Sequence, residues 1–165
     1  MNGISKAIFL WGAICLVGYG VYHFPSFGMD VIQPLPFWSL LTVIGIAGMM
    51  AWVPSWQKNK VVWIWLGVGI LGMAVHWLFL LKVIPSSLVP VLAVSPWAFW
   101  ALVQGVGFVL TGKYWKSHFY YGVGILQFIV FGLLFFTNMV GLYSSALLAL
   151  ATGIPLMYDG LKGQK

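Results

Sequence analysis

Long apolar segments that carry almost no charge constrain this chain more than any other feature of its sequence. Only 6% of the 165 residues are charged and 62% are hydrophobic, whereas about a quarter of the residues in an ordinary soluble domain are charged. A chain this apolar needs a lipid environment to cover its surface. We therefore expect a polytopic membrane protein, and not a soluble domain, a disordered chain or a nucleic-acid-binding protein.

The apolar segments have the length of membrane-spanning helices. A helix needs about 20 apolar residues to cross a hydrocarbon core that is ~30 Å thick. The segments lack the alternation of polar and apolar residues that a β-barrel needs, and prolines such as Pro25, Pro54 and Pro85 separate them. The sequence predicts a single all-α domain over residues 1–165, a bundle of six transmembrane helices at about 5–24, 35–54, 61–82, 90–112, 117–137 and 139–158.

The fourth segment allows two interpretations. Ser95, Pro96 and Trp97 form a typical helix start, with a serine N-cap and a proline in the first turn. The helix then begins at Ser95, and residues 87–94 are extended or re-entrant. Alternatively, one long helix is kinked at Pro96. We favour the kinked helix, because non-helical backbone exposed to lipid is costly.

The lysines predict the orientation of the chain in the membrane. All eight basic residues are lysines, and they outnumber the two acids, which gives a net charge of +6. Alternation of six helices places Lys82 on one side and all the others on the opposite side, namely Lys6, Lys58, Lys60, Lys113, Lys116, Lys162 and Lys165. Cytoplasmic loops of membrane proteins are enriched in lysine and arginine. We expect a protein of the plasma (inner) membrane with both termini in the cytoplasm.

Two similar helix pairs suggest an internal repeat. Residues 66–71 resemble residues 121–126, and in the preceding segments Pro36, Val43 and Gly45 align with Pro96, Val103 and Gly105. The pairs 35–82 and 90–137 are then copies of one hairpin, as in transporters with parallel repeats. Chance similarity is the alternative, because these residue types are common throughout the chain.

Few polar side chains lie within the predicted spans, and these are the candidate ligand-binding residues: His76, Gln104, Gln127, Thr42 and Tyr143. A lone polar group in hydrocarbon needs a partner. The residues therefore either form hydrogen bonds between helices or line a site for a small neutral, aromatic or cationic molecule. Cation–π attraction would hold a cation there without a carboxylate.

Two histidines are the candidate metal ligands. His23 and His76 are both predicted near the outer face, where two imidazoles at one depth are suited to a haem or a metal ion. The alternative is that each caps a helix end or satisfies a neighbour. No cysteine pair is available, because Cys15 is the only cysteine in the sequence.

The functional hypotheses follow from what the predicted spans contain. They hold no acid and no nucleophile–base set, so we lean against an enzyme and against ion-coupled transport. The first hypothesis is a protein that binds or transports a small neutral, aromatic or cationic molecule within the bundle. The second is a non-catalytic accessory or assembly subunit of a larger membrane complex, with other membrane subunits or further copies of itself as partners. The third is a haem- or metal-binding redox protein that uses His23 and His76.

Overall fold

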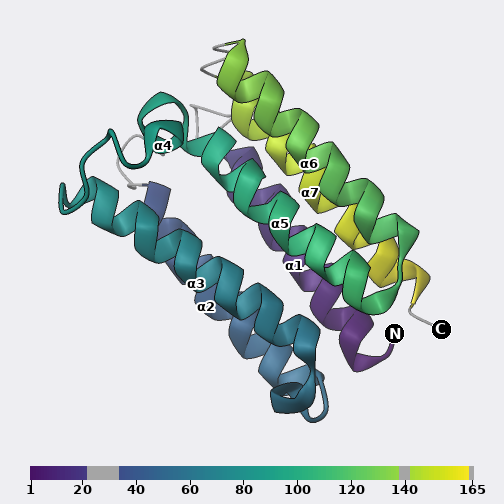
Figure 1. Cartoon of the computed structure of the whole chain (residues 1–165). Helices are drawn as coiled ribbons and strands as arrows, with labels where there is room; N and C mark the ends of the chain where they lie inside the picture. The colour runs from purple at the N-terminus through teal and green to yellow at the C-terminus, as the bar shows by residue number, and fades with distance from the viewer. Residues whose placement is uncertain (22–33, 138–141, 164–165) are drawn as a thin grey trace. The chain divides into compact units, whose positions relative to one another are not determined.

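The structure is a computed structural model that describes residues 1–165 except 22–33, 138–141 and 164–165. The described residues are helical and contain no strand, as the sequence predicts (Figure 1). The helices are α1 (Gly3–Gly20), α2 (Pro34–Trp52), the 3-10 turn η4 (Trp56–Lys58), α3 (Lys60–Leu80), α4 (Pro90–Val94), α5 (Pro96–Trp115), α6 (His118–Phe136) and α7 (Leu142–Lys162).

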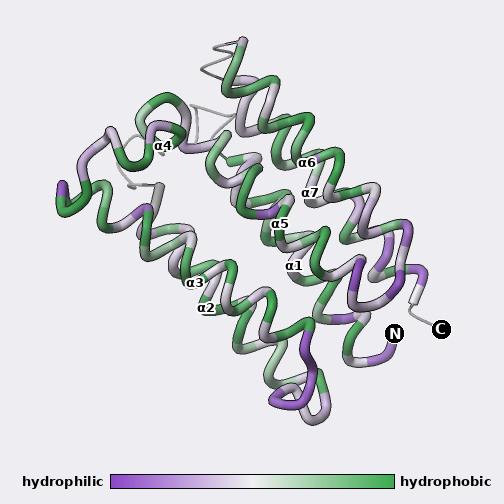
Figure 2. The backbone as a smooth tube through the Cα atoms, viewed as in Figure 1, coloured by the Kyte–Doolittle hydropathy of each residue, from purple (hydrophilic) through white to green (hydrophobic). Residues whose placement is uncertain are grey.

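Three of these helices are long and apolar enough to cross a membrane, namely α1, α3 and α6. A shorter apolar stretch, Pro36–Trp52, lies within α2. Helices α5 and α7 have sufficient length but carry more polar residues, among them Gln104 and Asp159. Figure 2 shows hydrophobic residues along the helices and hydrophilic residues at the turns and chain ends. The structure therefore supports association with a membrane, with three clear candidate spans in the described part of the chain.

The fourth predicted segment is broken at Ser95, and the predicted kinked helix is wrong. Ser95 has extended backbone angles (φ −156°, ψ 109°), so it separates the five-residue α4 from α5. Its hydroxyl accepts a hydrogen bond of 3.2 Å from the backbone N–H of Ala98. That bond satisfies one of the amide groups that a helix leaves unpaired at its start. Pro96 has no amide hydrogen to satisfy, so a helix start costs less here than a continuous helix.

The chain forms two compact units. The first unit contains residues 1–58 and 145–165, and in it α1 packs against α2 and α7. Glycines bring α1 and α7 close together: a Cβ atom on Gly12 would lie 2.6 Å from the backbone nitrogen of Met157. A Cβ atom on Gly153 would lie 2.9 Å from the backbone nitrogen of Leu16. The two backbones are therefore in direct contact, the way helices associate in lipid.

The second unit contains residues 59–144. Its central helix is α5, which packs against α6 on one side and α3 on the other (Figure 1). Glycines again permit the closest approach, since a Cβ atom on Gly112 would lie 2.9 Å from the backbone nitrogen of Tyr121 in α6. Helices α2 and α3 belong to different units, so the predicted hairpin of residues 35–82 is not one packing unit.

Candidate functional site

Four of the five predicted ligand-binding residues lie in the second unit, and three of these four are buried on its long helices. His76 is on α3, Gln104 on α5 and Gln127 on α6, and all three side chains are buried. Each of these helices thus contributes at least one buried polar side chain to a unit that is otherwise mostly apolar and aromatic. These residues, with their neighbours on α3 and α5, form the candidate site.

His76 is held by Trp100 on the facing helix. The indole Nε1 of Trp100 donates a hydrogen bond of 3.1 Å to Nδ1 of His76. The rings of Phe99 and Trp100 each lie with their centroids 6.1 Å from that of the imidazole, and the Phe99 contact is edge-on. The imidazole is therefore fixed by one hydrogen bond and two aromatic contacts, and only 7% of its surface is exposed.

This hydrogen bond determines what His76 can do chemically. An indole N–H can only donate, so Nδ1 of His76 must carry its lone pair and the neutral ring must carry its proton on Nε2. The single in-plane lone pair of the neutral imidazole is then taken by Trp100, and the other ring nitrogen carries the proton. His76 presents a hydrogen-bond donor at Nε2, whereas a metal or haem iron would need a free ring lone pair. The geometry suits an acceptor atom of a neutral ligand.

A second indole hydrogen bond connects α3 and α5 about three helical turns from the first. Nε1 of Trp65 donates to the Thr111 hydroxyl at 3.0 Å, and that hydroxyl donates to the backbone oxygen of Gly107 at 2.9 Å. Sequence reasoning missed Trp65, Trp100 and Thr111 as members of this polar network. The signal available was the presence of tryptophans on both helices, because a buried indole N–H usually finds an acceptor.

The other two predicted ligand-binding residues, Thr42 and Tyr143, are not buried residues of the second unit. Thr42 is half-buried on α2 in the first unit. Tyr143 is 72% exposed at the start of α7. The structure therefore places His76, Gln104 and Gln127 as buried residues of the second unit, Tyr143 as an exposed residue of the same unit, and Thr42 in the first unit.

The predicted metal site is only partly covered by the structure. His23 lies outside the described residues. Within the described ranges, no group of three or more His, Cys, Asp or Glu side chains is placed to hold a metal ion. His76 offers Nε2–H and not a lone pair, so its geometry does not fit the role of a metal ligand.

Comparison of the chain with protein-family models, with curated proteins and with solved structures found no match.

Proposed function

We propose that the chain is an integral protein of the plasma (inner) membrane that crosses the bilayer six times, with both termini in the cytoplasm. The spans are α1, α2, α3, α5, α6 and α7. Support comes from the scarcity of charge in the sequence, from the three long apolar helices and from the uneven distribution of lysines.

Within this membrane protein, we propose that the second unit binds a small neutral molecule beside His76, for storage or transport. One observation carries the proposal: Trp100 fixes the imidazole so that Nε2 presents a proton. The ligand would offer a hydrogen-bond acceptor, such as a carbonyl oxygen, on an aromatic or apolar body. The aromatic walls of Phe99 and Trp100 fit such a body. Of the predicted ligand classes, a cation is disfavoured because Nε2–H would face it with positive partial charge.

Two substitutions of His76 test the proposal. Asparagine places an acceptor near the Nδ1 position and lacks the Nε2 donor, so His76→Asn keeps the Trp100 hydrogen bond and loses the ligand contact. Glutamine reaches the Nε2 position with an amide donor and loses the acceptor for Trp100. We expect His76→Asn to fold normally and to weaken binding about tenfold, the effect of one lost hydrogen bond of ~1.4 kcal/mol. His76→Gln should retain binding with lower stability.

The measurement is binding of acetophenone, a neutral aromatic ketone, to the purified protein in detergent. α-Methylstyrene is the matched control, because it replaces the carbonyl oxygen of acetophenone with a CH2 group. Preference for acetophenone that disappears in His76→Asn would support the site. Equal binding of the two compounds, or destabilisation by His76→Asn with unchanged binding, would assign His76 a purely structural role.

A non-catalytic accessory or assembly subunit is the second candidate function. Gly67 on α3 and Gly122 on α6 have no atom within 4 Å of the position of a Cβ atom. Small residues on the outer faces of membrane helices allow close approach of another helix. Gly67→Leu should then reduce the mass of the detergent-purified assembly measured by light scattering, and an unchanged mass would contradict a role of this face in assembly.

A further inference from the structure

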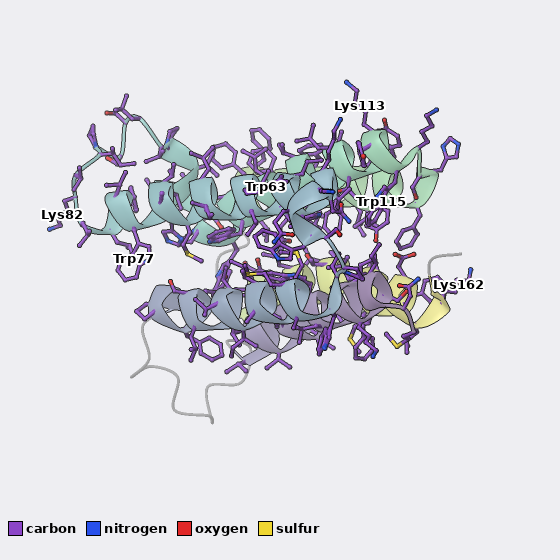
Figure 3. All side chains as sticks on the ribbon, turned by 90° about the horizontal axis from the view of Figure 1, so that it is seen from below. Trp63, Trp77, Lys82, Lys113, Trp115 and Lys162 are labelled. Carbon is purple, nitrogen blue, oxygen red and sulfur yellow. The ribbon has the colours of Figure 1, made fainter. Side chains whose placement is uncertain are left out.

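Three of the four lysines of the second unit lie together at one end of it. Lys60 begins α3, Lys113 lies in the last turn of α5 and Lys116 lies in the turn before α6, and all three side chains are exposed. The ammonium group of Lys60 lies 5.7 Å from the centroid of the Tyr114 ring, so the start of α3 lies beside the end of α5. The fourth lysine, Lys82, lies at the opposite end (Figure 3). We call the first three residues the lysine cluster.

No acid in the sequence of this unit balances the lysine cluster. Residues 59–144, which make up the unit, contain neither aspartate nor glutamate. The two acids of the chain, Asp30 and Asp159, are outside this range. Ammonium groups gathered at one end of a unit repel one another, and an anionic partner from outside the unit would remove that repulsion.

Helix dipoles account for only one of the three lysines. Lys113 lies in the last turn of α5, where a cation is favourable. Lys60 is the first residue of α3, where the helix dipole disfavours a cation and favours an acid. Lys116 lies between the end of α5 and the start of α6, where the two dipoles act on it in opposite directions. The charge of the cluster therefore points to a partner outside the helices.

Aromatic side chains lie beside the lysine cluster with part of their surface uncovered. Trp63, one turn into α3, is 53% exposed, Tyr114 is 48% exposed and Phe119, in the first turn of α6, is 37% exposed. The Phe119 ring packs edge-on against the buried Tyr120, with 5.4 Å between the ring centroids. Exposed rings next to lysines are typical of the headgroup region of a membrane.

We propose that this end of the second unit binds the headgroup of an anionic phospholipid. The ammonium groups of the lysine cluster bind the phosphate oxygens, and the exposed rings contact the glycerol backbone and the first methylene groups of the acyl chains. A phospholipid fits better than a free phosphate, because only the lipid offers an apolar body to the rings. The site rests on the proposed membrane location, and on neither the His76 site nor the number of spans.

Native mass spectrometry of the purified full-length protein in detergent tests the site. The probes are dioleoylphosphatidylglycerol, which is anionic, and dioleoylphosphatidylcholine, which has the same acyl chains and no net charge. We expect the protein to retain phosphatidylglycerol in preference. Lys116→Gly should weaken that binding about fivefold, the contribution of one lysine near an anionic surface, and Lys60→Gln on α3 should weaken it to a similar extent.

Lys82→Gly is the matched control for Lys116→Gly. Both lysines have left-handed backbone angles, with φ of 57° at Lys82 and 51° at Lys116. Both substitutions thus remove one charge and introduce glycine where glycine is the favoured residue, so neither should lower stability. Weaker binding in Lys116→Gly with unchanged binding in Lys82→Gly would support the site. Equal losses in the two variants would overturn it, because net charge and not position would then decide the binding.

The lipid site and the membrane location fail in different ways. Equal retention of the two lipids by the detergent-solubilised protein would overturn the site and leave the membrane location intact. Recovery of the protein as a monodisperse species without detergent would overturn both.

Discussion

At the scale of single residues, Lys116 shows how the turn between α5 and α6 is made. It has left-handed backbone angles (φ 51°, ψ 39°) directly after the last residue of α5. The following amide, on Ser117, donates a hydrogen bond of 2.9 Å to the backbone oxygen of Gly112. Glycine is the usual residue at such a position, because a side chain makes the left-handed conformation about 1 kcal/mol less favourable.

Lys116→Gly should therefore stabilise the protein by up to about 1 kcal/mol. Lys113→Gly is the matched control, because it removes the same charge from a position in the last helical turn of α5. At that helical position, glycine should lower the free energy of unfolding by about 0.5–1 kcal/mol. Unfolding by SDS titration measures both variants. Equal changes in the two variants would show that charge and not backbone conformation decides the effect.

The bond between Trp65 and Thr111 is the other residue-scale feature that lends itself to measurement. A double-mutant cycle of Trp65→Phe and Thr111→Val separates the hydrogen bond from the loss of packing. We expect a coupling free energy of about 0.6–2 kcal/mol, as for other hydrogen bonds between membrane helices. Additive effects of the two substitutions in SDS titration would contradict a stabilising role for this bond.

At the scale of helices, the sequence predicts where helices begin and end better than it predicts which helices contact one another. The segment predicted at 61–82 is the helix Lys60–Leu80, which begins after the N-cap Asn59. Ser95 is a typical serine N-cap and indicates the start of α5 correctly, whereas the cost of exposed backbone in lipid favours one kinked helix. The satisfied amide of Ala98 shows why the local signal prevailed.

Contacts between helices could not be predicted, because they depend on the partner and not on the helix. Gly67 and Gly72 lie on one helix, yet Gly67 faces open space and Gly72 lies beneath the Trp100 ring. For the same reason the sequence did not reveal that Trp100 holds His76. Trp65 and Gly72 are seven residues apart, as are Trp100 and Gly107. Only the structure shows that each tryptophan ring packs on the glycine of the facing helix.

Alanine substitutions of two glycines test this dependence on the partner. Gly153→Ala places a Cβ atom 2.9 Å from the backbone nitrogen of Leu16, so α1 and α7 must separate, at a cost of about 1–3 kcal/mol. Gly67→Ala meets no atom within 4 Å and should stabilise α3 by up to about 1 kcal/mol through helix propensity. We expect the two substitutions to change the free energy of unfolding, measured by SDS titration, in opposite directions. A similar loss at both positions would mean that glycine flexibility matters more than packing.

At the scale of the whole molecule, lysines and aromatic rings mark the ends of the helices. In the second unit, Lys82 and Trp77 lie at one end, and Lys113 and Trp115 at the other (Figure 3). The ammonium group of Lys60 lies 5.7 Å from the centroid of the Tyr114 ring, which brings Lys60 to the latter end. At the end of α7, the ammonium group of Lys162 lies 4.9 Å from the centroid of the Tyr158 ring. Such pairs suit the membrane–water interface.

The lysine distribution predicts which turns face the cytoplasm, and single cysteines test the prediction. In a Cys15→Ala background, cysteine replaces one exposed lysine at a time, at Lys58, Lys82 or Lys116. Six spans with the lysine-rich side inside predict that an impermeant maleimide labels only Lys82→Cys in intact spheroplasts. Lys58→Cys and Lys116→Cys should react only after permeabilisation, and this second reaction is the control for accessibility.

The same experiment separates six spans from three. If only α1, α3 and α6 crossed the membrane, residue 58 would follow one crossing and residues 82 and 116 would both follow two. Cysteines at 58 and 116 would then lie on opposite sides, whereas six spans place them on the same side. Charge favours the six-span arrangement, because only that arrangement keeps Lys58, Lys60, Lys113 and Lys116 together on one face. Labelling of Lys58→Cys from outside would therefore overturn the six-span proposal, whatever the result at Lys82.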